Sequence, residues 1–300
     1  MKKRYCMLLL APMILSCVGC QKKDLGPVNV VLVSGQSNAT GCSRSSFITY
    51  SLGKDKHDEF AKGFDDVLIS YDCWTKDGFD TGNYTYFSQN ASNGFVPVKL
   101  GQGNGTNTFG PEIGIAEELH EKYGGKLFII KYACGASNLK DDWAQTDSPM
   151  YPRFIEYVKN AMKDLADKGY KPTIKAFCWM QGEGDSYESK YYDNYKENTR
   201  TFVSNIRREL FELAGEKDIP FIDAKISDTG GWLFWEKVNE AKEEFAKESE
   251  NNFLIDTIEA GMRTNYEPNP VDIAHYDSDS EVLLGRLFAK TFEQFLDPVE

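Results

Sequence analysis

A serine in the segment SGQSNATG, residues 34–41, follows directly after a run of aliphatic residues. A hydroxyl at the end of a buried strand can act as a nucleophile when a neighbouring base removes its proton. Ser37 could equally cap a helix, form a tight turn or lie in a solvated loop, and a serine between a strand and a helix is usually a cap. Ser37 alone therefore does not decide between chemistry and structure.

Histidine is the usual base for such a hydroxyl, and the sequence contains three histidines. His57 and His120 lie in strongly charged segments, which predicts that both are solvated. His275 lies in a polar loop before the last predicted helix, and Asp272 precedes it by three residues. At that spacing a carboxylate can fold back onto the imidazole, hold one tautomer and stabilise the cation. The alternative is an Asp–His pair that caps the helix, so chemistry requires that the pair meets Ser37.

Continuous apolar runs predict the strands that position these residues, because strands covered by helices on both faces are apolar throughout. The runs span residues 28–34, 126–133, 174–180, 219–226 and 252–257. Helical patterns follow the strands in alternation, beginning at Pro111, Pro152, Tyr191, Leu233 and Asp279. This alternation predicts a three-layer α/β/α sandwich with a central parallel five-stranded sheet, whose ligand site lies outside the carboxyl ends of the strands.

Residues 42–108 interrupt the alternation with many Gly, Asn, Ser and Tyr residues. We interpret them as a long insertion after the first strand, with one strand predicted over 66–72. A connection of this length is usually functional or disordered, and its aromatic residues could line a sugar site or form surface hairpins. The glycine-rich segment 101–110 lacks the Lys-Ser/Thr end of a phosphate loop, so we predict a mobile loop near the site.

Five short motifs stand in order at the predicted element ends: GQSN (35–38), FGPE (109–112), ACGASNLKDDW (133–143), WMQGEGD (179–185) and DIAH (272–275). Together they resemble the SGNH hydrolases, and more narrowly the carbohydrate-esterase and sialate O-acetylesterase branch of that superfamily. The resemblance extends over about residues 28–295. It implies the flavodoxin-like SGNH hydrolase fold and a serine esterase that needs no cofactor.

The resemblance also implies roles for individual residues. Ser37 would be the nucleophile, His275 the general base and then acid, and Asp272 the residue that orients the imidazole. The oxyanion hole would consist of the backbone N–H groups of Ser37 and Gly135 and the side-chain amide of Gln181. A glycine lets the backbone approach the reacting carbonyl closely, and a fixed amide donor needs no reorganisation when charge develops.

The segment WMQGEGD offers a second chemistry, because Glu183 and Asp185 stand where paired carboxylates could cleave a glycosidic bond. About five strand–helix units are too few for an eight-stranded barrel, so we interpret the two acids as groups that fix a loop or bind substrate hydroxyls. Gln36 and Asn38 beside Ser37 are the other candidates for substrate contact. Asn38 has the simpler alternative of bonding to the local backbone.

The N-terminus carries three basic residues ahead of an apolar stretch, which predicts an export signal too short to span a bilayer comfortably. Cys17 and Cys20 each end a sequence that resembles a lipobox, so either could carry a lipid, and plain secretion is the alternative. We therefore predict a lipoprotein-type signal peptide over 1–20, a tether over 21–27 and a single domain over 28–300. The protein would be lipid-anchored in the cell envelope or secreted.

The net charge and the cysteine spacing argue against some classes of binding partner and cofactor. A net charge of −12 argues against nucleic acid and other anionic polymers, which the chain would repel. Four cysteines of the predicted domain fit no zinc pattern, and we predict no metal site. Export would permit disulfides without specifying a pair. These cysteines are Cys42, Cys73, Cys134 and Cys178.

Together with the candidate triad, the resemblance implies a serine esterase that removes O-acetyl groups from carbohydrates of the acetyl-xylan or sialate type through an acetyl-enzyme. The predicted partner is thus an acetylated carbohydrate. One alternative is a catalytically inactive surface lipoprotein that binds glycans. The other is a glycoside hydrolase that uses Glu183 and Asp185.

Overall fold

The computed structural model describes residues 23–78, 82–120, 122–264, 266–268 and 270–298. The predicted signal peptide, with Cys17 and Cys20, and the first two residues of the tether lie outside these ranges. Within them, no helix combines the length and the apolar character that crossing a bilayer requires.

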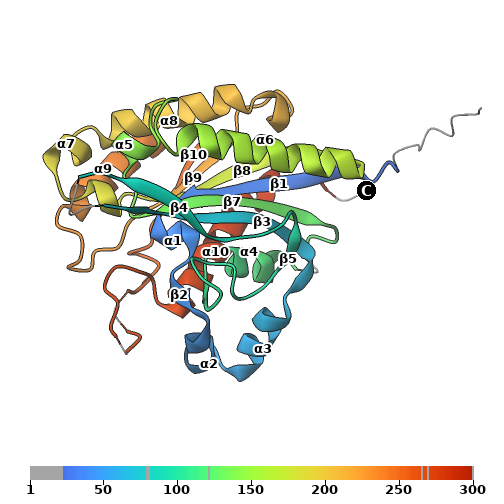
Figure 1. Ribbon diagram of the computed structural model, residues 1–300, viewed down its shortest axis with the longest axis horizontal. Coiled ribbons are helices and arrows are strands. Elements are labelled where there is room, and N and C mark those ends of the chain that lie inside the picture. Colours follow the sequence, from blue (N-terminus) through green and yellow to red (C-terminus); the bar gives the residue numbers. More distant parts are fainter. Residues whose placement is uncertain (1–22, 79–81, 121, 265, 269, 299–300) are drawn as a thin grey trace, which may run out of the picture.

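A mostly parallel sheet forms the middle layer of the molecule (Figure 1). In the described residues its strands lie in the order β10 (Asn252–Ile255), β9 (Phe221–Ala224), β8 (Tyr170–Met180), β1 (Gly26–Gly35), β7 (Leu127–Gly135), β3 (Phe64–Asp77) and β4 (Thr85–Ala91). The strands from β10 to β3 run parallel to one another. Strand β4 and the short β5 (Val96–Val98) pair antiparallel with β3.

The sheet confirms the predicted α/β class and all five predicted strands, but it is not the purely parallel five-stranded sheet that we expected. Strand β3 confirms the strand predicted over 66–72 and joins the sheet as a further parallel strand, while β4 and β5 add antiparallel pairing at the edge. Buried and partly exposed side chains are interspersed along β3, because it lies next to the sheet edge. A strand covered on only part of its surface does not need a continuous apolar run.

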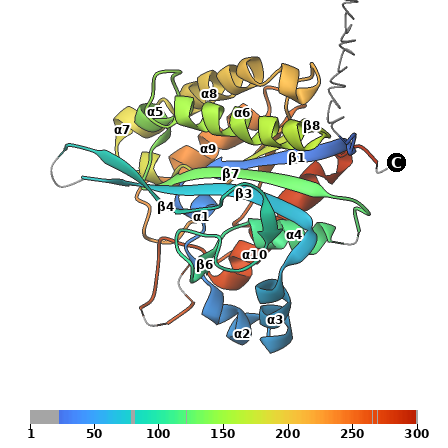
Figure 2. The same cartoon turned by 45° about the vertical axis from the view of Figure 1, so that its right-hand side comes forward.

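Helices cover both faces of the sheet (Figures 1 and 2). On one face lie α6 (Tyr151–Lys168) and α8 (Tyr195–Glu209), and on the other α4 (Glu112–Leu119) and α10 (Ser278–Phe292). Helices α4 and α10 pack with their backbones in contact: a Cβ on Gly114 would lie 1.9 Å from the Val282 carbonyl oxygen, and one on Gly285 would lie 2.0 Å from that of Pro111. Only glycine permits this approach.

The structure also contains further helices and short strands. They are α1 (Ser37–Thr40), β2 (Ser43–Arg44), η1 (Ser45–Phe47), α2 (Ile48–Ser51), α3 (Lys54–Lys62), β6 (Thr108–Phe109), α5 (Leu139–Asp142), η2 (Glu183–Asp185), α7 (Ser189–Tyr192), η3 (Glu212–Ala214), α9 (Trp235–Ala246) and η4 (Glu293–Phe295). The segment 42–108 thus contains strands and helices over much of its length, and the irregular structure that we expected there is wrong in this respect.

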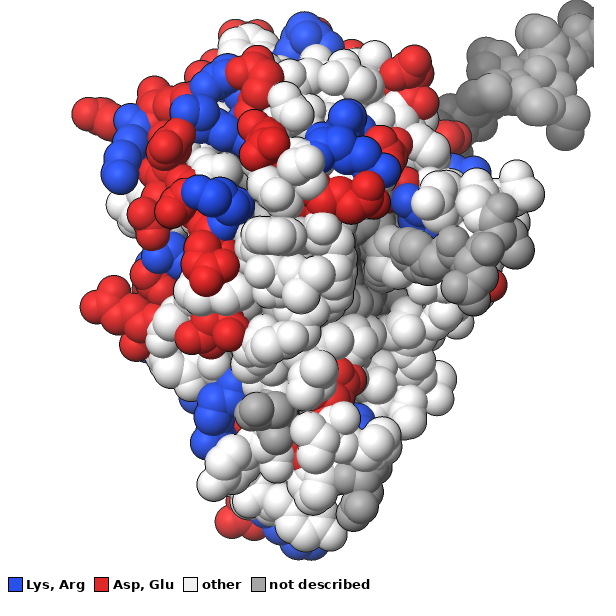
Figure 3. Space-filling view, turned by 90° about the vertical axis from the view of Figure 1, so that its left-hand side faces the viewer, with Lys and Arg blue, Asp and Glu red and all other residues white. Residues whose placement is uncertain are grey.

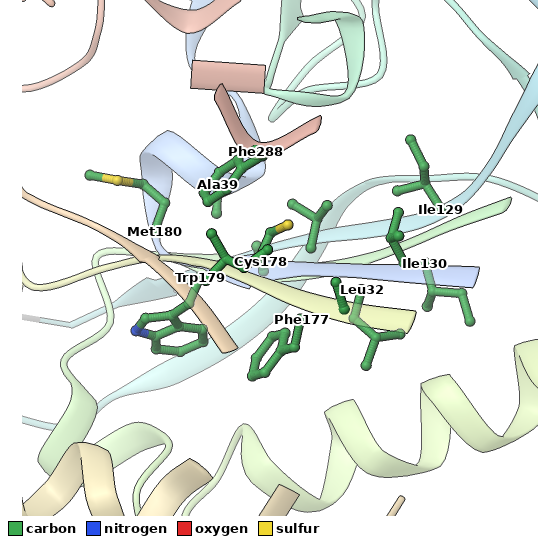
Figure 4. Close-up of a cluster of buried hydrophobic side chains, with 14 of the residues drawn as sticks. Leu32, Ala39, Ile129, Ile130, Phe177, Cys178, Trp179, Met180 and Phe288 are labelled. Carbon is green, nitrogen blue, oxygen red and sulfur yellow. The ribbon is translucent and has the colours of Figure 1, made fainter. Parts of the chain in front are cut away.

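The core lies between the sheet and the two helical layers. Figure 4 shows Leu32 of β1, Ile130 of β7 and Phe177 of β8 in this cluster, with Phe288 of α10 approaching from the other layer. Each such side chain contributes about 1.5–3 kcal/mol when it is fully buried. The core extends to Trp179 near the end of β8, which is also fully buried, so tight packing reaches the strand ends.

Three central strands end together, and this brings the sequence motifs to one edge of the sheet. In the pairing of β1 with its neighbours, Gly35 stands beside Ala133 of β7 and Met180 of β8. The residues that follow these strand ends therefore emerge side by side. They include Ser37 and Gln181, and Gly135 is the last residue of β7.

Candidate active site

Ser37 begins helix α1 immediately after β1. The turn before it is tight, because Gly35 has a φ of 140° and a Cβ there would lie 1.9 Å from the Met180 carbonyl oxygen. The N–H of Gln36 donates to that same oxygen at 2.9 Å. Gln36 occupies the capping position of α1, and no side chain caps this helix. The Ser37 hydroxyl is therefore not a helix cap, and Ser37 lines a pocket instead.

This pocket has a volume of about 490 Å³ and lies at the carboxyl ends of the central strands. Ser37, Gly135 and His275 all line it, so the fold brings the first and last motifs of the chain to one cavity. A Cβ on Gly135 would lie 3.8 Å from the Cβ of Ser37, so the backbone of Gly135 passes close to the serine. The segment 42–108 contributes Cys42, Thr75, Lys76, Tyr84 and Asn104 to the lining.

Asp272 and His275 form a hydrogen-bonded pair in the loop before α10. Asp272 Oδ2 lies 2.7 Å from His275 Nδ1, while Oδ1 accepts the backbone N–H groups of Ala274 at 2.9 Å and His275 at 3.1 Å. Burial alone would raise the pKa of Asp272, but the hydrogen bond and charge of His275, together with the two backbone N–H donors, outweigh burial and lower that pKa to about 2. An ionised carboxylate thus holds the proton of the neutral imidazole on Nδ1, so Nε2 is the nitrogen that can accept a proton.

Cys42 lines the same pocket as His275 and affects the pKa of its imidazole. Burial disfavours the charged ring, but hydrogen bonds with Asp272 and Cys42 outweigh burial and raise the pKa of His275 above its ordinary value. Sequence reasoning did not select Cys42 for the site. Gly41, which directly precedes Cys42, has a φ of 94°.

The side chain of Gln181 is not part of the pocket lining. It is fully buried, and its Nε2 donates to Asp185 Oδ2 at 2.5 Å and to Gln36 Oε1 at 3.3 Å. Its Oε1 accepts the hydroxyl of Tyr195 at 3.0 Å. Because both amide hydrogens are used inside the protein, the predicted place of Gln181 in an oxyanion hole does not fit this geometry.

Gln36 lies between Gln181 and the pocket, and it does line the pocket. Its Oε1 accepts hydrogen bonds from Gln181 Nε2, from the N–H of Gly184 at 3.1 Å and, at a longer 3.5 Å, from that of Gly182. These donors fix the oxygen on one side of the planar amide, so Nε2 lies on the other side. Gln36 therefore brings a side-chain amide to the pocket directly before Ser37 in the chain.

Neither Glu183 nor Asp185 lines the pocket, and both carboxyl groups are fully buried. Burial raises the pKa of both, to about 7 for Asp185. Asp185 Oδ2 accepts the N–H of Leu139 at 2.8 Å. The predicted contacts of these two acids with substrate are thus not what the structure shows, and a glycosidase would need carboxyl groups that reach the sugar.

Asn38 also lies outside the pocket lining, and only 2% of it is exposed. Its Nδ2 donates to Glu183 Oε1 at 2.7 Å, and its Oδ1 accepts the N–H of Tyr276 at 3.1 Å. One side chain therefore connects the turn after β8, the serine helix and the residue after His275. Asn38 thus connects distant segments through buried hydrogen bonds, and its partners are not the local backbone groups that the sequence suggested.

Aromatic side chains form part of the pocket wall. Tyr187 and Trp232 meet edge to face with ring centroids 5.8 Å apart, and Tyr84 and Tyr191 also line the pocket. Trp143 and Trp179 belong to the core instead, where their rings lie 5.3 Å apart. The sequence did not separate these tryptophans, because all of them lie near strand ends or in loops rich in other aromatic residues.

The other histidines lie away from the pocket. The His57 side chain is 31% exposed, and His120 lies 2.6 Å from a carboxylate oxygen of Asp66. In the described part of the chain, no three His, Cys, Asp or Glu side chains are grouped so that they could hold a metal ion. The cysteines Cys42, Cys73, Cys134 and Cys178 are free thiols.

Comparison with known families gives a match over nearly the whole described chain. Residues 27–294 match the family model described as carbohydrate esterase, sialic acid-specific acetylesterase. Among curated proteins, a probable carbohydrate esterase from Arabidopsis thaliana is 23% identical over 164 residues. That alignment covers 55% of this chain and spans about half, 54%, of the relative's length.

Solved structures show the same fold at low sequence identity. The structure of an Arabidopsis thaliana protein superposes with a TM-score of 0.60 at 19% identity, covering 89% of this chain and 98% of the other. The structure of NanS gives 0.58 at 16% identity, with 90% and 97% covered. A carbohydrate acetylesterase from Xanthomonas citri gives 0.57 at 15% identity, with 89% and 56% covered.

Proposed function

Since this chain belongs to the family of carbohydrate esterases described as sialic acid-specific acetylesterases, we propose that it removes O-acetyl groups from a carbohydrate with Ser37 as the nucleophile. One observation carries the proposal: Ser37 lines the same pocket as a histidine whose Nδ1 is held by a carboxylate. A helix-capping serine or a capping Asp–His pair would have no need of a common cavity.

In the proposed reaction, Nε2 of His275 takes the hydroxyl proton of Ser37 as Oγ attacks the acetyl carbonyl carbon. The tetrahedral intermediate collapses when the sugar oxygen leaves, and the imidazolium gives that oxygen its proton. An acetyl group then remains on Ser37. Water, deprotonated by His275, attacks this ester, and acetate leaves as the serine regains its proton.

The negative charge on the acetyl oxygen needs fixed donors. We propose the backbone N–H groups of Ser37 and Gly135, together with Nε2 of Gln36 in place of Gln181. This choice is supported by two observations: Gln36 lines the pocket, and its Oε1 accepts three hydrogen bonds from within the protein, so Nε2 is the atom of this amide left to donate to a ligand. One such donor typically contributes about 3 kcal/mol to the transition state.

The test is acetate release from acetylated glycans by the parent and by Ser37→Ala. We expect the variant to lose hydrolysis while its thermal unfolding stays unchanged. Ser51→Ala is the matched control, because Ser51 lies on α2 and its hydroxyl only donates to the Phe47 carbonyl. Equal activity in Ser37→Ala and the parent would disprove the proposal. Glycan binding without turnover by the parent would favour an inactive binding protein.

Export is a separate part of the proposal and rests on the sequence alone. We propose that the chain is exported and carries a lipid on Cys17 or Cys20. Mass spectrometry of the N-terminal peptide of the mature protein, with Cys17→Ala and Cys20→Ala side by side, would identify the modified residue. An unmodified mature N-terminus would favour plain secretion.

A further inference from the structure

The positive charge in the pocket is already neutralised. Among the described residues that line it, Lys76 is the only lysine or arginine. Its Nζ lies 2.8 Å from Asp142 Oδ2, and neither side chain is more than 1% exposed. The Tyr86 hydroxyl and the N–H of Asn138 also donate to the Asp142 carboxylate. The positive charge of Lys76 is therefore paired with a buried carboxylate of the protein.

Lys76 cannot turn to an anionic ligand without leaving Asp142 buried and uncompensated, which is strongly unfavourable in a protein interior. Its Nζ also lies 4.1 Å from the centre of the Tyr84 ring, which covers it. The pair comes from β3 and α5, two elements that meet at this edge of the fold. Its position is thus fixed by the fold as well as by charge.

Among the described residues that line the pocket, the other charged or titratable groups, Glu188 and His275, are also paired, while Lys140 and Lys190 lie outside the lining, beside the Tyr191 ring. Glu188 lines the pocket and pairs with Lys190 at its rim at 3.0 Å, so these charges balance. The imidazole of His275 is held by Asp272. Outside the described residues, the positions after Lys22 contain no lysine or arginine.

The surface around the carboxyl ends of the strands also carries little charge near its middle. Figure 3 shows mostly white, uncharged atoms in the middle of this face, with most of the red and blue residues to the left and above and a few below and to the right. The whole chain carries a net charge of −12, which repels anions at long range. Both the lining and the overall field therefore favour an uncharged ligand.

Aromatic rings supply the contact area that such a ligand needs. Tyr84 is 46% and Tyr187 is 44% exposed, and both line the pocket together with Trp232. Aromatic side chains combine a large apolar face with a polar end, which suits the C–H faces and hydroxyl groups of a pyranose ring. A carboxylate on the sugar would instead call for an arginine fork or an unpaired lysine.

We infer that the substrate is an O-acetylated neutral pyranoside and that a sugar bearing a carboxylate, such as a sialic acid, is disfavoured in this pocket. This inference rests on the proposed function, because it concerns the carbohydrate whose acetyl group Ser37 attacks. The inferred substrate therefore differs from the sialic acid that the family description names.

The test compares two esters that differ in one charge: O-acetylated N-acetylneuraminic acid and its carboxyl methyl ester. Acetate release is measured for both and for an acetylated xylooligosaccharide, with 4-nitrophenyl acetate as the reporter of basic esterase chemistry. We expect kcat/KM for the methyl ester to exceed that for the free acid by about tenfold at low salt, and the gap to narrow as salt screens the repulsion. Equal or faster hydrolysis of the free acid would overturn the inference.

A binding measurement separates this inference from the proposed function. Calorimetry of the Ser37→Ala protein with the same two esters should show tighter binding of the methyl ester even if the parent hydrolyses nothing. Asp142→Asn should raise the relative activity on the free acid, because it leaves Lys76 uncompensated. The double variant Lys76→Met, Asp142→Asn should keep the parent's preference. A preference that Asp142→Asn leaves unchanged would count against the role of this pair.

Discussion

The carboxylate of Asp272 holds His275 at two points: one oxygen lies 2.7 Å from Nδ1 of the ring, and the other accepts the backbone N–H of the same residue at 3.1 Å. Ring and backbone are thereby fixed together by a spacing of three residues in one loop. The ring nitrogen that remains, Nε2, belongs to a residue that lines the pocket with Ser37. The predictions below follow from this arrangement.

Asp272→Asn should lower kcat/KM for acetate release by about 10²–10⁴-fold, because an asparagine amide can offer a hydrogen to Nδ1 and so favour the wrong tautomer. The loss should be smaller than in Ser37→Ala. Asp272 is 44% exposed, so thermal unfolding should change little. Wild-type kinetics in a folded Asp272→Asn protein would show that the carboxylate does not orient the base.

The midpoint of the pH profile of kcat/KM should lie above pH 6.5, and Cys42 should move this midpoint to higher pH. The base acts as a neutral imidazole, and the pKa of His275 is raised above 6.5, so kcat/KM should rise with pH through a midpoint above 6.5. Cys42→Ala removes one of the hydrogen bonds that raise this pKa and should move the midpoint to lower pH. Cys178→Ala is the control, because that thiol is buried in β8. An unmoved midpoint in Cys42→Ala would contradict the contact.

Gln36→Glu should reduce kcat by about 10²–10³-fold with a smaller effect on KM, because it replaces an amide donor with an oxygen where negative charge develops. The glutamate can still accept from the N–H of Gly184. Gln181→Met should act differently. It leaves buried Asp185 without its amide partner and should lower the free energy of unfolding by about 1–3 kcal/mol. A large loss of kcat in Gln181→Met with little loss of kcat in Gln36→Glu would instead identify Gln181 as the donor.

Asn38→Ala should lower both stability and turnover. It removes the hydrogen bonds to Glu183 and to the N–H of Tyr276, which costs about 1–3 kcal/mol for buried groups left unpaired. The loop that contains His275 then loses the hydrogen bond that holds it to α1, so kcat should fall while KM stays similar. Asn194→Ala, at an exposed 3.4 Å contact, should change unfolding in urea by less than about 0.5 kcal/mol. Full activity in Asn38→Ala would show that the connection is not needed.

The sequence predicted the parallel strands well because each is covered on both faces and therefore apolar throughout. Strand β3 contains many polar residues, since its outer neighbours are the short β4 and β5, and no periodicity signals that it lies beside β7. The same difficulty applies to the site. A short motif predicts that a residue stands at a strand end, but the direction of its side chain depends on contacts with distant segments.

Gln36 and Gln181 show this most clearly. Both follow strands that end side by side, and either amide could reach the pocket from the sequence alone. Their roles separate only because Asp185 and Tyr195 occupy the amide of Gln181. The Lys76–Asp142 pair could not be predicted from the sequence for a similar reason, because its partners are 66 positions apart on different elements.

The most direct measurement of the central claim is the mass of the protein during turnover. A rapid acid quench of the enzyme mixed with 4-nitrophenyl acetate, followed by peptide mass spectrometry, should find one acetyl group on the peptide that contains Ser37. Ser37→Ala should carry none under the same conditions. Acetate release at the parent's rate without an acetyl group on Ser37, or an acetyl group on another residue, would contradict the account.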